Sequence, residues 1–260
     1  MNPPLRISSR DNPLLVRLRR LVQDPGAYRK SGLVWLEGEH LCSALRARGR
    51  PAQQAVLSES AAADPARLAF ARWAAESIVV PDRLYAALSA LPSPAGFGFV
   101  MELPVQPAPA AWTAAVVLDR LQDAGNVGSI LRSAAAFGIT QVLALVGTAA
   151  LWSPKVLRAG QGAHFGLQLC EGLTLQDLDA LQLPLVAASV HAGDELPQAA
   201  LPAPCAWVFG HEGQGVAADL LARCTHTVRI PQPGGQESLN VAAAAAVCLY
   251  ESLRRSRGGQ

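Results

Sequence analysis

The sequence predicts an α/β protein whose larger, carboxyl-terminal part is built on a parallel sheet. Short apolar runs of strand length alternate with helical patterns through that part, and a proline-rich segment separates it from a smaller α/β part. Two glycine-rich loops, "GHEGQG" at 210–215 and "IPQPGGQESLN" at 230–240, each follow an apolar run and lead into a helical pattern. Strands that alternate with helices form parallel sheets covered on both faces, and ligands bind at the carboxyl ends of such strands. We therefore expect the two loops to line one binding site.

Length and composition indicate a globular protein. The 260 residues suffice for one large domain or two modest ones, and half of them are hydrophobic while only 16% are charged. The longest clean apolar run, Val241–Tyr250, is too short to span a bilayer, and the first residues lack the apolar segment of a secretion signal. We therefore expect a cytoplasmic protein that does not bind membranes.

The cysteines and histidines indicate neither disulfides nor a metal site. The five cysteines are odd in number, widely spread and never arranged as C-x-x-C, so we expect small buried apolar side chains. The five histidines show neither H-x-x-x-H nor H-E-x-x-H spacing, so no metal ligand set is expected.

Positive charge is concentrated at the amino-terminal end. Residues 1–50 carry ten basic and four acidic side chains, a net charge of +6, which leaves −4 for the rest of the chain. This asymmetry indicates a polyanionic partner, nucleic acid, although the segment "VRLRRL" at 16–21 taken alone also fits a solvated helix face. The basic residues expected to contact the nucleic acid are Arg10, Arg17, Arg20, Arg29 and Lys30.

The amino-terminal part, 1–103, is expected to form a small α/β domain. Apolar residues recur with a helical period at 14, 15, 18, 21 and 22, which predicts a helix over 12–24. Short apolar runs predict strands at 32–38, 54–58, 76–81 and 96–102, and helices are expected at 39–49, 61–75 and 82–91. Three prolines between 104 and 110 then mark a stiff linker, assigned to 104–112.

The second domain is assigned to 113–260. Its predicted strands lie at 114–121, 141–146, 165–170, 184–190, 205–210 and 225–230. Its predicted helices lie at 126–138, 153–163, 174–182, 216–224 and 238–256, and Ser153 with Pro154 has the chemistry of a helix start. The last helix is apolar all round, which a buried core helix and a dimer interface both explain.

The helix predicted from Asn126 carries polar residues beside a strand end. At about 100° per residue its apolar and polar residues fall on opposite faces. The apolar face holds Val127, Ile130, Leu131 and Ala134, and the polar face holds Asn126, Ser129, Arg132 and Ser133. We therefore expect Asn126 and Arg132 to point the same way, although a helix cap and a solvated arginine explain the same two residues.

The two glycine loops carry the other candidate residues. Three glycines in 210–215 let the backbone approach a ligand closely, and Glu212 is the only carboxylate there. Ser238, expected to cap the last helix, and Asn240 lead out of the second loop.

A rival interpretation is a dinucleotide-binding oxidoreductase. The segment 213–218 fits G-x-G-x-x-A, but the chain has no room for a second nucleotide-binding half beyond it. The acid expected about twenty residues later would be Glu237, which lies in a glycine loop. The sequence contains neither G-x-x-x-x-G-K-[ST] nor G-x-S-x-G, which excludes a P-loop and a nucleophile elbow.

Three segments together resemble the motifs of one enzyme family. "NVGSILRSAAAFG", "VFGHEGQGV" and "IPQPGGQESLNV", in this order and spacing, resemble those of the SpoU/TrmH family, the SPOUT-class RNA 2′-O-ribose methyltransferases. The resemblance covers about 113–254. The segments "SRDNPLLVRLRRL" and "WLEGEHL" are similar to the RNA-binding extension of that family, a small α/β domain like certain ribosomal proteins.

The resemblance implies a trefoil knot in the carboxyl-terminal segment, a homodimer with active sites at the subunit interface, and S-adenosyl-L-methionine as cofactor. It implies an RNA substrate, with rRNA slightly favoured over tRNA. By motif position the cofactor is held by Gly210, Ile230, Gln232, Gly234 and Leu239. The catalytic and substrate positions are Asn126, Arg132, Glu212, Ser238 and Asn240. Two positions depart from the family, since Gln232 replaces a frequent methionine and Ala242 a frequent serine.

The resemblance casts Arg132 as general base, but arginine hardly deprotonates in proteins. We expect Arg132 instead to hold the neighbouring phosphate and to stabilise the developing alkoxide, because its planar fork suits phosphate. Asn126 and Asn240 would orient groups, and Glu212 would fix either Arg132 or its own loop. An RNA-binding protein with this fold and no turnover is the alternative.

Overall fold

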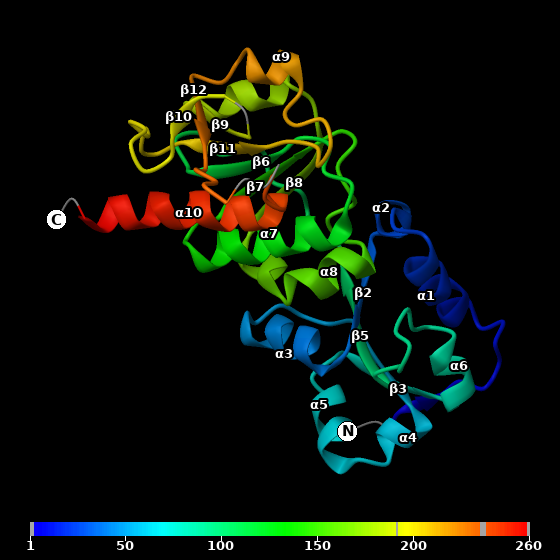
Figure 1. Cartoon of the computed structure of the whole chain (residues 1–260). Coiled ribbons are helices and arrows are strands. Elements are labelled where there is room, and N and C mark those ends of the chain that lie inside the picture. Colours follow the sequence, from blue (N-terminus) through cyan, green and yellow to red (C-terminus); the bar gives the residue numbers. More distant parts are fainter. Residues whose placement is uncertain (1–2, 191, 235–237, 259–260) are drawn as a thin grey trace. The chain divides into compact units, whose positions relative to one another are not determined.

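The computed structural model describes residues 3–190, 192–234 and 238–258 (Figure 1). The chain divides into two compact units. The first consists of Met1–Val105 and Trp152–Phe165, and the second of Gln106–Leu151 and Gly166–Gln260.

The first unit is built on a five-stranded sheet of order β1-β4-β3-β5-β2, in which β5 runs antiparallel to β2 and β3 while the other pairs are parallel. Its strands are β1 (Leu5–Arg6), β2 (Leu33–Glu37), β3 (Gln54–Ser58), β4 (Glu76–Val80) and β5 (Phe97–Glu102). Its helices are α1 (Pro13–Gln23), α2 (Ala27–Ser31), α3 (Glu39–Ala47), α4 (Glu59–Ala62), α5 (Pro65–Ala71), α6 (Asp82–Ala86) and α8 (Pro154–Gly160). A 3-10 turn, η1, covers Ala163–Gly166.

Helix α1 shows how the sequence determines these elements. Asn12 caps it by accepting a hydrogen bond from the N–H of Leu14 at 2.9 Å, and Pro13 occupies the first turn, where a missing N–H costs nothing. Its leucines at 14, 15, 18 and 21 are buried, while Arg17 and Arg20 are exposed. Strand β1 has only two residues and therefore no pattern that a sequence could reveal.

Helix α8 packs with the first unit. The domain assignment made from the sequence, with a linker at 104–112, places this helix in the second domain. The predicted cap is confirmed, since Ser153 Oγ accepts from the N–H of Val156 at 3.4 Å and Pro154 follows. Val156 and Leu157 are buried, and α8 contacts β2. Gly162 approaches α3 so closely that a Cβ there would lie 2.5 Å from that of Ala44.

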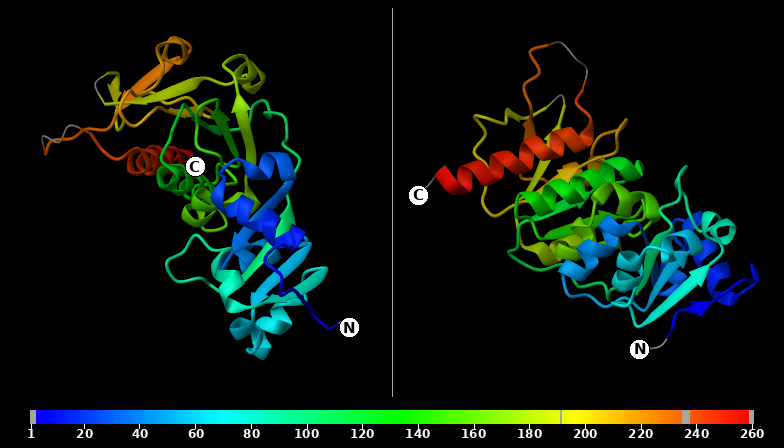
Figure 2. Two further views of the ribbon diagram at one scale, coloured as in Figure 1. Left: turned by 90° about the vertical axis from the view of Figure 1, so that its right-hand side faces the viewer. Right: turned by 90° about the horizontal axis from the view of Figure 1, so that it is seen from below.

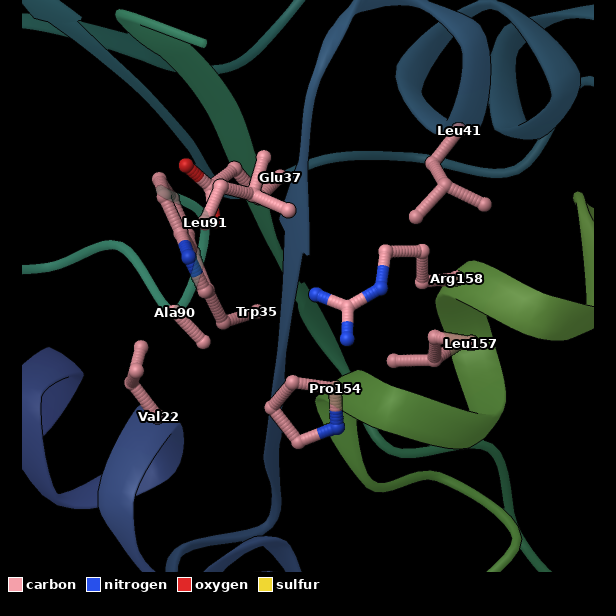
Figure 3. A pocket seen from close by; sticks show the side chains of 9 residues that line it. All are labelled: Val22, Trp35, Glu37, Leu41, Ala90, Leu91, Pro154, Leu157 and Arg158. Atoms are coloured by element: carbon pink, nitrogen blue, oxygen red, sulfur yellow. The ribbon is translucent and has the colours of Figure 1, made fainter. Parts of the chain in front are cut away.

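A small cavity of about 30 Å³ lies between α8 and β2 (Figure 3). Its lining includes Trp35 and Glu37 of β2, and Arg158 extends into it from α8. This volume corresponds to about one water molecule, so the cavity is too small for an organic ligand.

The second unit is built on a seven-stranded sheet of order β10-β12-β9-β11-β6-β7-β8, and every strand pair is parallel. Its strands are β6 (Ala115–Leu118), β7 (Gln141–Leu145), β8 (Gln168–Leu173), β9 (Leu185–Ser189), β10 (Asp194–Glu195), β11 (Ala206–Phe209) and β12 (His226–Arg229). Its helices are α7 (Ala124–Ala136), α9 (Ala218–Leu221), α10 (Val241–Gly258) and the 3-10 helix η2 (Gln176–Leu181). The predicted parallel sheet is confirmed.

Two predicted helices of this unit differ from the structure. The segment expected to be helical over 174–182 forms the 3-10 helix η2, which ends at Gln182 in the left-handed conformation. The helix expected over 216–224 is the single turn α9. Only Leu178 and Leu181 of η2 and Leu220 of α9 are buried, so each segment covers the sheet with a short turn.

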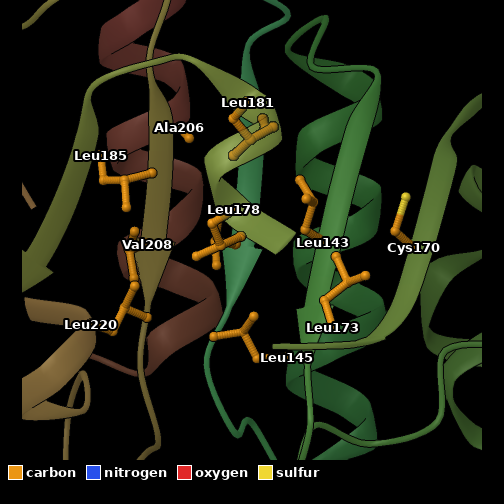
Figure 4. Close-up of a cluster of buried hydrophobic side chains, with 12 residues drawn as sticks. Leu143, Leu145, Cys170, Leu173, Leu178, Leu181, Leu185, Ala206, Val208 and Leu220 are labelled. Carbon is orange, nitrogen blue, oxygen red and sulfur yellow. The ribbon is translucent and has the colours of Figure 1, made fainter. Parts of the chain in front are cut away.

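The core of the second unit lies on both faces of its sheet. On one face, leucines of η2 and α9 pack against the strands (Figure 4). On the other face α7 and α10 lie side by side (Figures 1 and 2), and α10 contacts β9 and β11. Trp207 of β11 is fully buried and donates its indole N–H to Ser252 of α10 at 2.9 Å. This contact fixes the carboxyl-terminal helix against the centre of the sheet.

The cysteines are all free thiols, and those at 42, 170, 205 and 248 are buried while Cys224 is half-buried. Burial raises the pKa of Cys205 to about 11. Within the described residues, none of the helices is both long and apolar enough to cross a membrane.

Arg255 holds the end of α10 against the segment 196–199. Arg255 donates to the carbonyl oxygens of Leu196 and Pro197, at 2.6 and 3.2 Å, and to that of Ala199. Glu251 accepts from Arg254 at 2.7 Å and from Arg255 at 2.6 Å. The hydrogen bond from Arg254, together with that from Arg255, outweighs partial burial and lowers the pKa of Glu251 to about 2.

Replacing Glu251 with glutamine is expected to destabilise the protein by about 1 kcal/mol at neutral pH. The folded-state pKa, about 2, lies below the ordinary value of 4.5, so this contribution is present above pH 4.5 and is lost as the pH falls toward 2. Urea unfolding of both proteins at several pH values measures the difference, which should shrink on acidification. Asp194→Asn, at an exposed carboxylate of the same unit, is the control. A difference that does not depend on pH would contradict the assignment.

Candidate active site

The site begins at the amino terminus of α7, where Asn126 does not cap the helix. Asp123 is the cap, because its side chain accepts from the N–H of Asn126 at 2.7 Å and the helix starts at Ala124. The alternative in which Asn126 serves as the cap is therefore wrong. The Asn126 side chain instead donates from Nδ2 to Glu212 at 3.2 Å and accepts from Asn240 Nδ2 at 2.9 Å. One residue from each of the three sequence motifs is thus joined in a single hydrogen-bonded chain.

Glu212 connects its own loop to the segment that follows β6. Its carboxylate accepts from the backbone N–H groups of Gln122 and Asp123, at 3.4 and 3.2 Å, as well as from Asn126. Partial burial opposes ionisation, but the hydrogen bonds outweigh it and lower the pKa of Glu212. No hydrogen bond or ion pair joins Glu212 to Arg132 among the described residues. Of the two roles expected for Glu212, the structure therefore supports the one in which it fixes the loop.

Asn240, rather than Ser238, caps the last helix. Its Oδ1 accepts from the N–H groups of Ala242 and Ala243, at 2.9 and 3.3 Å. The expectation that Ser238 is the cap is wrong because α10 begins at Val241, later than the sequence pattern suggested. Asn240 thus uses both ends of its amide, one for the helix and one for Asn126.

The 210–217 loop is held in a tight turn. A Cβ on Gly210 would lie 2.2 Å from the carbonyl carbon of Gly215 and from the nitrogen of Val216, so only glycine fits. His211 Nδ1 accepts from the N–H groups of Gly213 and Gln214, at 3.0 and 3.3 Å. The N–H of Gly215 donates to the carbonyl of His211 at 2.8 Å and closes the turn.

Asp119 and Arg120 are two residues that sequence reasoning missed. Asp119 is only 2% exposed, and it accepts from Arg120 Nε at 2.9 Å and from the N–H of Ala217 at 2.7 Å. The sequence feature that could have identified these two residues is the polar segment "DRLQDAGN", at the end of the first strand of the second unit.

A cavity of about 880 Å³ opens at the carboxyl ends of β9, β11 and β12. Four of the five predicted cofactor residues line it, namely Gly210, Ile230, Gln232 and Leu239. Glu212, Ser238 and Asn240 also line it, whereas Gly234, Asn126 and Arg132 do not. The Gln232 Oε1 atom is buried and has no hydrogen-bond partner among the described residues. The two glycine loops therefore form walls of one cavity.

Arg132 lies apart from this network in a single chain. It is exposed on α7, six residues or about 9 Å along the helix from Asn126. No hydrogen bond or ion pair holds its guanidinium within the described part of the chain. Arg132 is therefore available to a ligand or a second protein chain.

The predicted RNA-contacting residues are all exposed in the first unit, on the loop before α1, on α1 itself and on α2. They are Arg10, Arg17, Arg20, Arg29 and Lys30. In the described residues no group of three or more His, Cys, Asp or Glu side chains is placed to hold a metal ion.

Comparison with known proteins identifies the family. Residues 113–250 match the SpoU rRNA Methylase family, which is more than half of the chain. The chain belongs to this family. The resemblance of the three motifs to SpoU proteins is thereby confirmed.

Two of the following three similar proteins match nearly the whole chain, and one matches about half of it. An uncharacterized tRNA/rRNA methyltransferase from Synechocystis sp. is 34% identical over 96% of this chain and 93% of its own length. The 23S rRNA (guanosine-2′-O-)-methyltransferase RlmB of Bordetella pertussis is 35% identical over 55% of this chain and 60% of its own length. A crystal structure of an RNA 2′-O ribose methyltransferase superposes with a TM-score of 0.79 and 30% identity, covering 97% of this chain and all of the other.

The dinucleotide interpretation lacks a structural basis. A pyrophosphate is bound at the amino terminus of a full helix that opens at the glycine turn, whereas α9 is a single turn of four residues. The proposed acid, Glu237, lies outside the described residues.

Proposed function

We propose that this protein transfers the methyl group of S-adenosyl-L-methionine to a ribose 2′-hydroxyl of RNA, with rRNA as the substrate. The observation that carries the proposal is the convergence of the three SpoU motifs. Asn126, Glu212 and Asn240 form one hydrogen-bonded chain, and its last two members line the 880 Å³ cavity. The names of the relatives support RNA as the substrate and the 2′-oxygen as the acceptor.

The cavity fits the cofactor in size and chemistry. Small-molecule sites typically occupy about 300–1,000 Å³ and combine apolar walls with a few polar groups. Ile230 and Leu239 supply apolar surface, Gly210 exposes backbone, and the buried oxygen of Gln232 is an acceptor without a donor. An amino or hydroxyl group of the cofactor would satisfy that oxygen. Gly234 remains a proposed contact, although it does not line the cavity.

The cofactor supplies a methyl group on a positively charged sulfur, so the protein's task is to position the acceptor and to remove its proton. Asn126 and Asn240 fix each other's amides, and Glu212 fixes Asn126 and the loop beside it. We assign Ser238, exposed at the cavity wall, to the substrate. We assign Arg132 to the RNA phosphate and to the charge that develops on the 2′-oxygen.

We propose that the first unit holds the RNA outside the catalytic cavity, as a ribosomal-protein-like domain assigned to 1–103. Its mixed five-stranded sheet and its exposed basic residues between 10 and 30 support this role. The linker assigned to 104–112 would join it to the methyltransferase domain, 113–260. We also propose that the protein is cytoplasmic, because it would encounter structured RNA there.

We further propose a homodimer and a trefoil knot. Val247 and Tyr250 of α10 are exposed, and Tyr250 stacks edge-on against Phe137 at the end of α7. This apolar surface supports a dimer that forms along α7 and α10. The position of Arg132 outside its own cavity supports active sites completed across that interface. The path of the chain supports the knot. After β12, which lies beside β9, the chain returns to form α10, which packs against α7.

Ribose methylation by the purified full chain tests the function. Protein is incubated with methyl-labelled cofactor and either ribosomal or transfer RNA, and the modified position is mapped by its resistance to alkaline cleavage, which needs a free 2′-hydroxyl. We expect label on a ribose of ribosomal RNA. Label on transfer RNA would correct the substrate, and binding of RNA and cofactor without transfer would favour the alternative of a catalytically silent RNA-binding protein.

A further inference from the structure

Arg120 has an unfavourable backbone conformation next to the cavity wall. It follows β6 and the buried Asp119, and its φ is +56°, in the left-handed region. Arginine rarely adopts this conformation, because its Cβ approaches the following carbonyl oxygen. Such residues persist where the surrounding structure holds them, and they cluster at functional sites.

The Arg120 side chain bridges two segments of the second unit. Its Nε and Nη2 donate to the two carboxylate oxygens of Asp119, at 2.9 and 3.2 Å. Its remaining donors reach the 210–217 loop, where Nη1 bonds to Gln214 Oε1 at 3.1 Å and Nη2 to the carbonyl of Gly215 at 3.4 Å. Asp119 binds the same loop through the N–H of Ala217. The pair therefore holds three neighbouring residues of the loop.

The residues that Arg120 holds belong to the cavity wall. Gln214 and Gly215 line the cavity, and Gly215 is the residue against which Gly210 packs. Arg120 does not line the cavity itself. Gly147, at φ +94°, leaves room for the arginine, since a Cβ there would lie 3.2 Å from Arg120 Cγ. Arg120 therefore contacts the residues of the cavity wall through its guanidinium, without lining the cavity itself.

We propose that Arg120 is a positioning residue which, anchored by Asp119, fixes the 210–217 loop in the shape that binds the cofactor. The effect of Arg120 on cofactor binding rests on the proposed function, whereas its effect on the loop rests on the hydrogen bonds given above. The arginine fork spreads its donors over three nitrogens and so bonds to Asp119, Gln214 and Gly215 together, whereas the donors of a lysine all radiate from one nitrogen.

The test compares two arginine-to-lysine variants of the full chain. Arg120→Lys keeps a positive charge beside the buried Asp119 but loses the fork, so we expect the dissociation constant of S-adenosyl-L-methionine, measured by calorimetry, to rise about tenfold. The KM for the cofactor should rise in parallel while kcat at saturation changes little. Arg223→Lys is the matched control, because Arg223 holds Leu175 and Asp179 in the same unit without touching the loop. Its cofactor affinity should equal that of the wild type.

A second readout is independent of the cofactor. Hydrogen exchange at the N–H groups of Gly215 and Ala217 should accelerate in Arg120→Lys and stay unchanged in Arg223→Lys. Gln214→Ala should add little to the Arg120→Lys effect, because both variants lose the same hydrogen bond between Arg120 and Gln214. Unchanged exchange, or equal loss of affinity in both lysine variants, would overturn the proposal. If the wild type binds no cofactor but exchange is still faster in Arg120→Lys, the role of Arg120 in holding the loop stands and the proposed function is refuted.

Discussion

Replacing Arg132 with alanine is expected to lower methyl transfer about a hundredfold or more, which is the usual cost of removing a donor that stabilises developing charge. The cofactor's dissociation constant should not change, because Arg132 does not line the cavity and forms no hydrogen bond with the residues that do. Its guanidinium is exposed and unpaired within the described residues of its own chain, so its removal breaks no hydrogen bond or ion pair there. Single-turnover transfer at saturating RNA and cofactor measures the rate, and calorimetry measures cofactor binding.

Two further variants separate charge from geometry. Arg132→Lys keeps the charge but cannot form a bidentate contact with phosphate, so its rate should fall between those of the wild type and the alanine variant. Arg257→Ala removes another exposed arginine from a helix of the same unit and should leave the rate unchanged. Full activity in Arg132→Ala would show that Arg132 neither anchors phosphate nor stabilises the alkoxide.

Local chemistry made much of the second unit predictable from sequence. Ser153 and Pro154 specify a helix start without help from distant residues. The apolar runs that became β6, β7 and β11 are buried on both faces, so their composition alone marks them as strands of a parallel sheet. The motif residues could be placed at one edge of the sheet because the carboxyl ends of parallel strands share that edge.

What the sequence could not supply depends on contacts between distant residues. Asp123 and Asn126 are both residue types that cap helices well. Only the structure shows that Asp123 is the cap and that the Asn126 side chain bonds to Glu212 instead. The pairing of Asp119 with Ala217 joins residues almost a hundred positions apart. Nothing in the composition of α8 showed which unit its apolar side would cover. These features follow from packing, which a local pattern does not encode.

Gly210→Ala is expected to weaken cofactor binding about a hundredfold. The added methyl would lie 2.2 Å from backbone atoms of Gly215 and Val216, and backbone cannot turn aside as a flexible side chain can. The loop must therefore move, and an overpacking cost of about 3 kcal/mol corresponds to that loss of affinity. Calorimetric titration with S-adenosyl-L-methionine measures the change, and the thermal midpoint shows whether the unit remains folded.

Gly213→Ala is the matched control for Gly210→Ala, because it makes the same chemical change in the same loop. Gly213 is exposed, and a Cβ there would meet only the His211 ring, at 3.8 Å, an ordinary contact distance. Its cofactor affinity should therefore stay close to that of the wild type. If both alanine variants bind equally well, the close approach of Gly210 to Gly215 does not shape the cavity. If both fail equally, the loop needs glycine for flexibility rather than for the fit at Gly210.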